Sequence, residues 1–349
     1  HRCGAARPAH RGAGRANHAP GNGAGLARVH ASRQAICRGQ LGAAVSLEGE
    51  EAAMVLIGSL LDLMVIAAAG RWLLPHVLRF LEGHRQVEMN YAGQVVPRGL
   101  GALLWLLLWL QELVLQLANR VIAYWQLDPL TRMESLETNH QVFVFAASLI
   151  FLLGWTDDLI GSKAVKGLKG HYRYWKETKT FSMGAVKALG IATAAGWLAL
   201  SAENEQTPIW WIGGQMLLLM LMTNALNLLD VRPGRSLKFF FTGVMTVVVV
   251  SLWLAGGSIP LVFPIWPVCL GGYLVYGMDV RGKGMLGDAG ANLLGFTLGY
   301  TVIMTLPWEM QCLIVIVLIL LHKQAEVSSI TALIERNRFL NWLDRLGRT

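Results

Sequence analysis

Two adjacent carboxylates, Asp157 and Asp158, are the first residues of this sequence whose types suggest chemistry. They stand at the end of an apolar stretch, where a charge inside the bilayer costs about 2.5–3.5 kcal/mol on insertion scales. Adjacent like charges also disfavour each other's ionised form. A divalent cation or a nearby lysine would remove both penalties, whereas the alternative is a solvated helix end. The candidate lysines that follow are Lys163, Lys166, Lys169, Lys176 and Lys179.

A second group of oxygen-bearing side chains surrounds residue 227. Asn224 and Asn227 are three residues apart, so they face one side of a helix, and Asp230 continues that face. Carboxylate and amide oxygens suit a hard cation such as Mg²⁺. Beyond them, Arg232 and Arg235 have the geometry to bind phosphate. Helix–helix packing is the alternative for the polar groups, and anchoring at lipid headgroups is the alternative for the arginines.

Three further stretches supply candidates. A glycine-rich turn leads into Asp288 at the expected start of a helix, where free amides and the positive helix end could hold phosphate oxygens. Arg98 stands at the edge of an apolar segment, as a substrate ligand or as a topology anchor. His322 follows the last apolar segment.

The elements that must position these residues are apolar helices. The chain is 54% hydrophobic and 15% charged, and roughly 20 apolar residues span a bilayer core. Because only helices and closed barrels satisfy the backbone in lipid, we expect an all-α polytopic transmembrane helical bundle of about nine to ten spans. The nine predicted segments are 54–70, 99–118, 142–155, 184–201, 208–224, 239–256, 259–277, 289–306 and 308–322.

The basic residues are distributed unevenly between the loops. Those after the odd-numbered segments contain 20 Lys and Arg, and those after the even-numbered segments contain 2. This asymmetry places the first set, with every candidate site residue, in the cytoplasm. The net charge of +8 therefore reports topology and membrane lipid, and we expect no nucleic acid partner.

The chain divides into three predicted parts. Residues 1–53 are rich in Ala, Gly and Arg, and we interpret them as a disordered or non-native extension upstream of a start at Met54. Residues 54–322 form the transmembrane domain, and 323–349 form a cytoplasmic amphipathic tail. In the tail, the predicted apolar face contains Phe339, Trp342, Leu343 and Leu346, opposite Asn341, Asp344, Arg345 and Arg348.

The loops resemble, in order, those of the polyprenyl-phosphate N-acetylhexosamine-1-phosphate transferases. This superfamily includes phospho-N-acetylmuramoyl-pentapeptide transferase and the N-acetylglucosamine-1-phosphate transferases. The resemblance covers about residues 54–326. The matching stretches are PRGLG at 97–101, GWTDDLIG at 154–161, NALNLLD at 224–230 and MLGDAG at 285–290.

The resemblance implies a cytoplasmic active site in the plasma membrane that serves cell-envelope glycan synthesis. There a UDP-amino-sugar donates its sugar 1-phosphate to a polyprenyl phosphate and UMP leaves. Asp157 is expected to engage or deprotonate the lipid phosphate, with Asp158 beside it. Asn227 and Asp288 are expected to hold Mg²⁺, and Asp230 to shape the nucleotide site. The other expected substrate-binding residues are Arg98, Asn224, Arg232, Arg235 and His322.

The third of these loops, which follows the predicted segment 208–224, departs from the family pattern. Where the pentapeptide transferases have a second Asp, this sequence has Pro233, between Arg232 and Arg235. We therefore expect these arginines to hold the donor's phosphates or an acidic group on its sugar. Two alternatives remain: a family member that has lost catalysis and serves as a membrane partner, and a transporter with carboxylates at its helix ends. The assembly is left open between a monomer and a homodimer.

Overall fold

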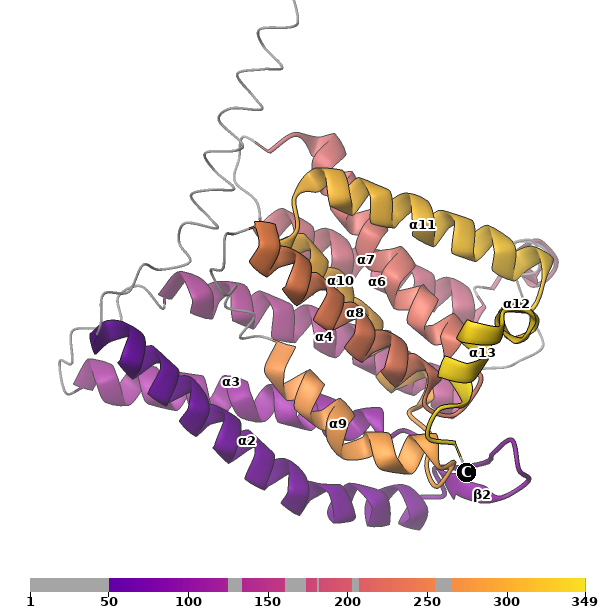
Figure 1. Ribbon diagram of the computed structural model, residues 1–349, viewed down its shortest axis with the longest axis horizontal. Helices are drawn as coiled ribbons and strands as arrows, with labels where there is room; N and C mark the ends of the chain where they lie inside the picture. The colour runs from indigo at the N-terminus through magenta and orange to yellow at the C-terminus, as the bar shows by residue number, and fades with distance from the viewer. Residues whose placement is uncertain are drawn as a thin grey trace, which may run out of the picture. The chain divides into compact units, whose positions relative to one another are not determined.

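The computed structural model describes residues 50–124, 134–160, 174–180, 182–202, 207–254 and 265–348. Residues 46–349 form one compact unit, and nearly all of the predicted 1–53 extension lies outside the described residues. Nine long helices of the described ranges follow the nine predicted segments in order (Figure 1). They are α2 (Glu50–Gly83), α3 (Gly101–Tyr124), α4 (Glu134–Ile160), α6 (Met183–Ala202), α7 (Ile209–Leu229), α8 (Arg235–Leu254), α9 (Trp266–Val280), α10 (Gly287–Thr305) and α11 (Trp308–Val327).

The prediction of an all-α polytopic membrane protein is confirmed. Among the described residues, 7 helices are long and apolar enough to cross a membrane. The other two of the nine are α9, which has 15 residues, and α10. α10 lies inside the protein, and nearly all its residues are buried. Its glycines allow close packing against neighbouring helices. Its threonines are tolerated inside the protein because each Thr hydroxyl donates to a carbonyl one turn earlier.

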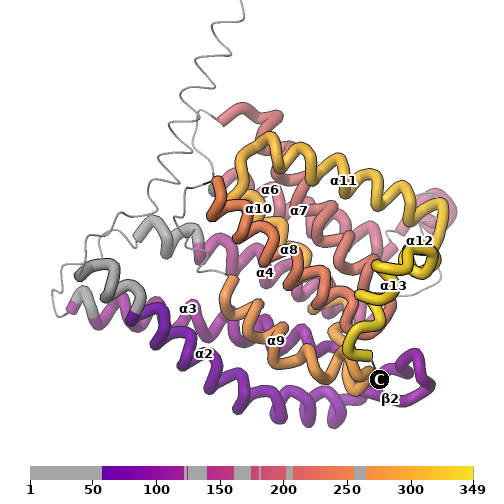
Figure 2. Tube along the Cα trace, in the orientation of Figure 1, coloured from indigo at the N-terminus to yellow at the C-terminus, as the bar shows by residue number. Residues whose placement is uncertain are grey.

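α10 is the helix around which the others are arranged. It packs against α3, α4, α7 and α8, while α2, α3 and α9 pack against one another along one side of the bundle (Figure 2). The small residues of α10 allow very close contacts. A Cβ on Gly101 would lie 2.3 Å from Cα of Gly290, and one on Gly154 would lie 2.6 Å from Cα of Ala289. The first turn of α10 is thus held between α3 and α4 by backbone contacts.

Short elements complete the chemistry-bearing end of the bundle. The first loop, which joins α2 to α3, contains an antiparallel hairpin of β1 (Val87–Met89) and β2 (Val95–Pro97) that the sequence did not predict. The tail forms α12 (Ile330–Arg336) and α13 (Arg338–Arg345). β2, α13 and the C-terminus lie at the same end of the bundle (Figure 1).

The tail has the predicted amphipathic character, and Asp344 of its polar side faces the protein while Arg345 stays exposed. Phe339 and Trp342 are 65% and 58% exposed, whereas Asp344 is buried. A helix that packs on a soluble core normally does the reverse. The outward apolar side suits the headgroup region of a bilayer.

A polar cluster also lies within the spans of α2, α3 and α4. Gln111 donates to Asp62 Oδ2 over 2.8 Å, and His140 Nδ1 lies 2.7 Å from Glu112 Oε2. His140 Nε2 lies 3.2 Å from Gln111 Oε1. All four side chains are buried. Their mutual bonds offset part of the cost of placing polar groups in the bilayer and tie the three helices together.

The close contact at Gly154 generates a prediction for stability. Gly154→Ala should lower the apparent melting temperature of the detergent-purified protein, because overpacking against backbone costs about 1–3 kcal/mol. Gly277→Ala is the matched control, since nothing lies within 4 Å of its added Cβ. This control should be neutral or slightly stabilising. Equal melting temperatures for the two variants would contradict the contact between α4 and α10.

Candidate active site

Asp158 fastens the start of α10 to the end of α4. Its Oδ1 accepts a hydrogen bond from the amide of Asp288 (3.0 Å), and its Oδ2 accepts one from the amide of Ala289 (3.1 Å). The side chain is 4% exposed. Gly287 makes this approach possible, because its φ is +76° and a Cβ there would lie 2.7 Å from Asp158 Oδ2. The amides that we expected to hold phosphate therefore bind this carboxylate instead.

Arg98 neutralises Asp158 from the first loop. Its Nη2 contacts Asp158 Oδ1 and lies 3.9 Å from Asp288 Oδ1, while its Nη1 binds Glu88 of β1 at 2.7 Å. A backbone hydrogen bond also joins the first loop to the residues before α10: the amide of Gly99 donates to the carbonyl of Met285 over 3.0 Å. The guanidinium is thus held by the hairpin and reaches both site carboxylates.

Lys187 of α6 bridges the other two carboxylates. Its ammonium lies 2.6 Å from Asp288 Oδ2 and 3.1 Å from Asp157 Oδ2. The Lys187 side chain is 9% exposed, whereas those of Asp157 and Asp288 are 23% and 30% exposed. Asp157 and Asp288 therefore form the open side of the cluster, and Asp158 forms its buried base.

Asp230 approaches the cluster from the end of α7, and Asn227 lies in the last turn of that helix. The Oδ1 atom of Asn227 is buried and has no hydrogen-bond partner among the described residues. Burial raises the pKa of Asp230 well above its ordinary value, and the nearby charges of Asp279 and Asp288 raise it further. This residue keeps some exposure as a whole, but its carboxyl group is enclosed by protein. The end of α7 thus carries one buried oxygen without a partner among the described residues and one enclosed carboxyl beside the other site carboxylates.

Asp279, near the end of α9, joins the third loop to the residues just before α10. Its Oδ2 accepts from the amide of Gly234 (2.8 Å), and its Oδ1 accepts from the amide of Leu286 (3.3 Å), two residues before Asp288. The residue is 4% exposed. Its carboxylate therefore sets the distance between the loop after α7 and the start of α10.

Four expected site residues have other surroundings. Asn224 and Arg232 are exposed, and no described hydrogen bond of their side chains reaches the carboxylates. Arg235 is buried and binds Asp344 of the tail. His322 Nδ1 lies 2.7 Å from the carbonyl of Leu318, and its Nε2 is buried without a partner in the described part of the chain. Their substrate-binding roles stay predictions.

The cluster is suited to a hard cation. Five Asp side chains meet two cationic side chains there, so negative charge is in excess when the carboxyls are ionised. No three His, Cys, Asp or Glu side chains of the described ranges are arranged to hold a metal ion by themselves. Mg²⁺ usually takes only one or two carboxylates and completes its shell with water and substrate phosphate. Asn227 Oδ1 and Asp288 fit that pattern. The five Asp residues are Asp157, Asp158, Asp230, Asp279 and Asp288.

Sequence reasoning missed two residues of this site. Lys187 falls near the start of the predicted 184–201 segment, whereas the lysines named as candidates to compensate the carboxylates all precede that segment. A lysine within an apolar span is costly, and that cost was the available signal. The sequence predicts no role for Asp279, because nothing local shows that its carboxylate binds two backbone amides.

The two adjacent carboxylates should respond differently to substitution. Asp158→Asn should destabilise the protein, because its amide nitrogen would face a backbone donor and Arg98 would lose its buried partner, a loss worth about 3–5 kcal/mol in buried pairs. Asp157→Asn should cost less than about 1 kcal/mol, since Lys187 keeps Asp288. Thermal unfolding in detergent measures both. A larger loss of stability in Asp157→Asn would contradict this division.

Comparison with known proteins agrees with this geometry. Residues 140–306 match the model of glycosyl transferase family 4. A search of curated proteins gives no match. The matched range includes every site carboxylate from Asp157 to Asp288. This match supports membership of the superfamily of polyprenyl-phosphate sugar-1-phosphate transferases.

Proposed function

We propose that this protein transfers a sugar 1-phosphate from a UDP-amino-sugar to a polyprenyl phosphate, and that UMP is released. Family membership supports a polyprenyl-phosphate sugar-1-phosphate transferase in general. The observation that carries the finer proposal is the open pair of Asp157 and Asp288 around Lys187, with the orphaned oxygen of Asn227 at the same bundle end. Carboxylates, an amide oxygen and fixed cations are what diphosphate chemistry requires.

In the proposed reaction, an oxygen of the lipid phosphate forms a bond to the phosphorus that carries the sugar. The P–O bond to the UMP phosphate breaks, and its electron pair leaves with UMP. Asp157 is the partly exposed carboxylate that engages the lipid phosphate or takes its proton. Lys187 and Arg98 attract the phosphates, and the buried pairs that hold these cations fix their positions before substrate arrives.

We propose Asn227 and Asp288 as the protein ligands of Mg²⁺, which would neutralise charge on the donor diphosphate when bound. Asn227 Oδ1 has no other partner among the described residues, and Asp288 is the more exposed carboxylate of the Lys187 pair. Asp230, whose carboxyl is enclosed and repelled by its neighbours, would shape the nucleotide side of the site.

The two alternatives differ from this proposal in what they leave unexplained. A transporter would use carboxylates along a path through the membrane, whereas these carboxylates collect at helix ends. A family member without catalysis would have no need for the partly exposed Asp157 beside Lys187. A screen of nucleotide sugars with purified protein, polyprenyl phosphate and Mg²⁺, read as UMP release, separates the proposal from both.

Asp288→Asn should abolish transfer and leave the fold intact. Loss of a metal ligand should lower the rate of UMP release at least about 100-fold, equivalent to about 3 kcal/mol of transition-state stabilisation. Lys187 retains Asp157 in this variant, so the melting temperature should change little. Glu309→Gln, an exposed carboxylate at the start of α11, is the control and should keep full activity. More than a tenth of wild-type activity at saturating Mg²⁺ would remove Asp288 from the metal site.

The cytoplasmic position of the site is a further part of the proposal, based on the 20 to 2 distribution of basic residues. In a variant with its native cysteines replaced, Glu335→Cys in the tail should resist a membrane-impermeant maleimide added to intact cells. Glu309→Cys, which follows the opposite end of α10, should be labelled. The reverse pattern would place the site on the outer face.

A further inference from the structure

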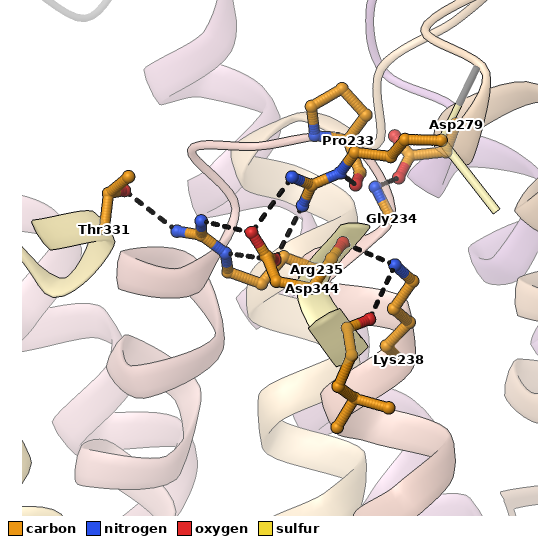
Figure 3. Close-up of polar contacts among 9 residues, drawn as sticks. Pro233, Gly234, Arg235, Lys238, Asp279, Thr331 and Asp344 are labelled. Carbon is orange, nitrogen blue, oxygen red and sulfur yellow. Dashed lines mark hydrogen bonds and ion pairs between the residues drawn. The ribbon is translucent and has the colours of Figure 1, made fainter. Parts of the chain in front are cut away.

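The carboxylate of Asp344 is the centre of a buried cluster that joins the tail to the third loop (Figure 3). Arg235 binds it with two hydrogen bonds, from Nε to Oδ1 (2.8 Å) and from Nη2 to Oδ2 (2.9 Å). Arg348 adds two more, of 2.9 Å and 2.7 Å. Asp344 therefore satisfies two guanidinium groups at once.

The electrostatics agree with a fixed, ionised carboxylate. Burial alone would raise the pKa of Asp344, but the hydrogen bonds from Arg235 and Arg348 lower it to about 2. Because this lies below the ordinary value of 3.8, the cluster contributes its full stability above about pH 4. That contribution is lost only as the pH falls toward 2.

Each residue of the turn from Pro233 to Arg235 has its own partner. The carbonyl of Pro233 accepts from Arg348 Nε (2.7 Å), and the amide of Gly234 donates to Asp279 (2.8 Å). Gly234 has φ of +73°, and a Cβ there would lie 2.8 Å from Val280. The turn is thus held between the tail on one side and the end of α9 on the other (Figure 3).

A second set of contacts fixes α13 itself. Lys238 Nζ donates to the carbonyls of Asp344 (2.7 Å) and Leu343 (3.2 Å), near the last turn of α13, where a cation is favourable. Arg235 Nη1 donates to Thr331 Oγ1 of α12 over 3.0 Å. Both tail helices are therefore attached to the first turn of α8.

This turn lies only a few residues beyond Asp230 and is connected through Asp279 to the start of α10. A change in the position of α13 would therefore be transmitted to the third loop. Buried ion pairs often add little net stability, since removal of their charges from water is expensive, but they can specify one geometry. Positioning is thus a better account of this cluster than stability alone.

We propose that Asp344 is a positioning residue for the transfer reaction: through Arg235 and Arg348 it fixes the turn at 233–235 and hence the place of Asp230 in the nucleotide site. This inference rests on the proposed function. It assigns Arg235 to the tail and leaves Arg232, which is exposed, as the arginine of this loop that is free to meet the donor.

The test compares Asp344→Asn with Glu335→Gln, which removes an exposed carboxylate from the same tail. Hydrogen exchange of full-length protein in detergent is the first readout. In Asp344→Asn, the peptide that contains Gly234 should exchange about tenfold faster, the factor for about 1.4 kcal/mol of easier local opening. The Glu335→Gln variant should match wild type. Unchanged exchange near Gly234 would overturn the proposal.

Steady-state kinetics are the second readout. Asp344→Asn should raise the KM for the nucleotide sugar roughly fivefold or more and leave the KM for polyprenyl phosphate unchanged. A uniform loss of kcat with both KM values unchanged would indicate a merely structural role and would overturn the proposal. Arg348→Gln removes the Pro233 contact and the two Arg348–Asp344 hydrogen bonds but keeps the Arg235–Asp344 pair, and it should show the same split if Asp344→Asn fails to fold.

The exchange experiment distinguishes the two hypotheses. If wild-type protein releases no UMP from any donor, the proposed function fails, and the exchange of the Gly234 peptide still decides whether Asp344 positions the loop. If transfer occurs but neither Asp344→Asn nor Arg348→Gln changes exchange or donor KM, the proposed function stands and the positioning role fails.

Discussion

A carboxylate that is 4% exposed at the edge of a membrane must be compensated by donors from its surroundings, and the rest of this site follows from how Asp158 is compensated. One guanidinium and two backbone amides meet it. They come from the first loop and from the start of α10. Three segments that are distant in the sequence are thereby joined at one point, and Asp288 is placed beside that point.

The close packing of α10 and the compensation of Asp158 depend on each other. Gly154 allows the backbone of α4 to touch α10, and that contact brings the end of α4 within hydrogen-bonding distance of the first amides of α10. Once these amides are occupied, the helix start cannot also serve as a phosphate site. In the proposed reaction, phosphate binding would then fall to Lys187 and Arg98 and to a cation held by side-chain oxygens, which would suit a diphosphate whose negative charge changes position.

Much of this architecture could be predicted from the sequence. The hydropathy pattern identified nine helices in order. Because the loops after odd-numbered segments all lie on one side of the membrane, the sequence also predicted that the carboxylates gather at one end of the bundle. The separate surroundings of Asp157 and Asp158 could not be predicted from their adjacency. Successive residues on a helix point about 100° apart, so two neighbours can face different partners. Only the tertiary structure shows that one faces α10 and the other faces Lys187.

Contacts between distant segments account for the other differences. Arg235 and Asp344 are 109 residues apart, and no local pattern links them. In the tail helix, Asp344 faces the protein because the buried guanidinium of Arg235 requires an anion, whereas Arg345 of the same helix stays exposed. The hairpin at 87–97 was missed because two three-residue strands give little periodicity.

The most direct test of this account is residue-resolved hydrogen exchange at the first turn of α10. The first amides of a helix have no partner within the helix and exchange quickly unless another group binds them. The account predicts that the amides of Asp288 and Ala289 are protected in the wild-type protein, and that Asp158→Asn removes this protection while Asp157→Asn keeps it. Unprotected amides at 288 and 289 in the wild type, or equal protection in the two variants, would contradict the role of Asp158 as the anchor of the site.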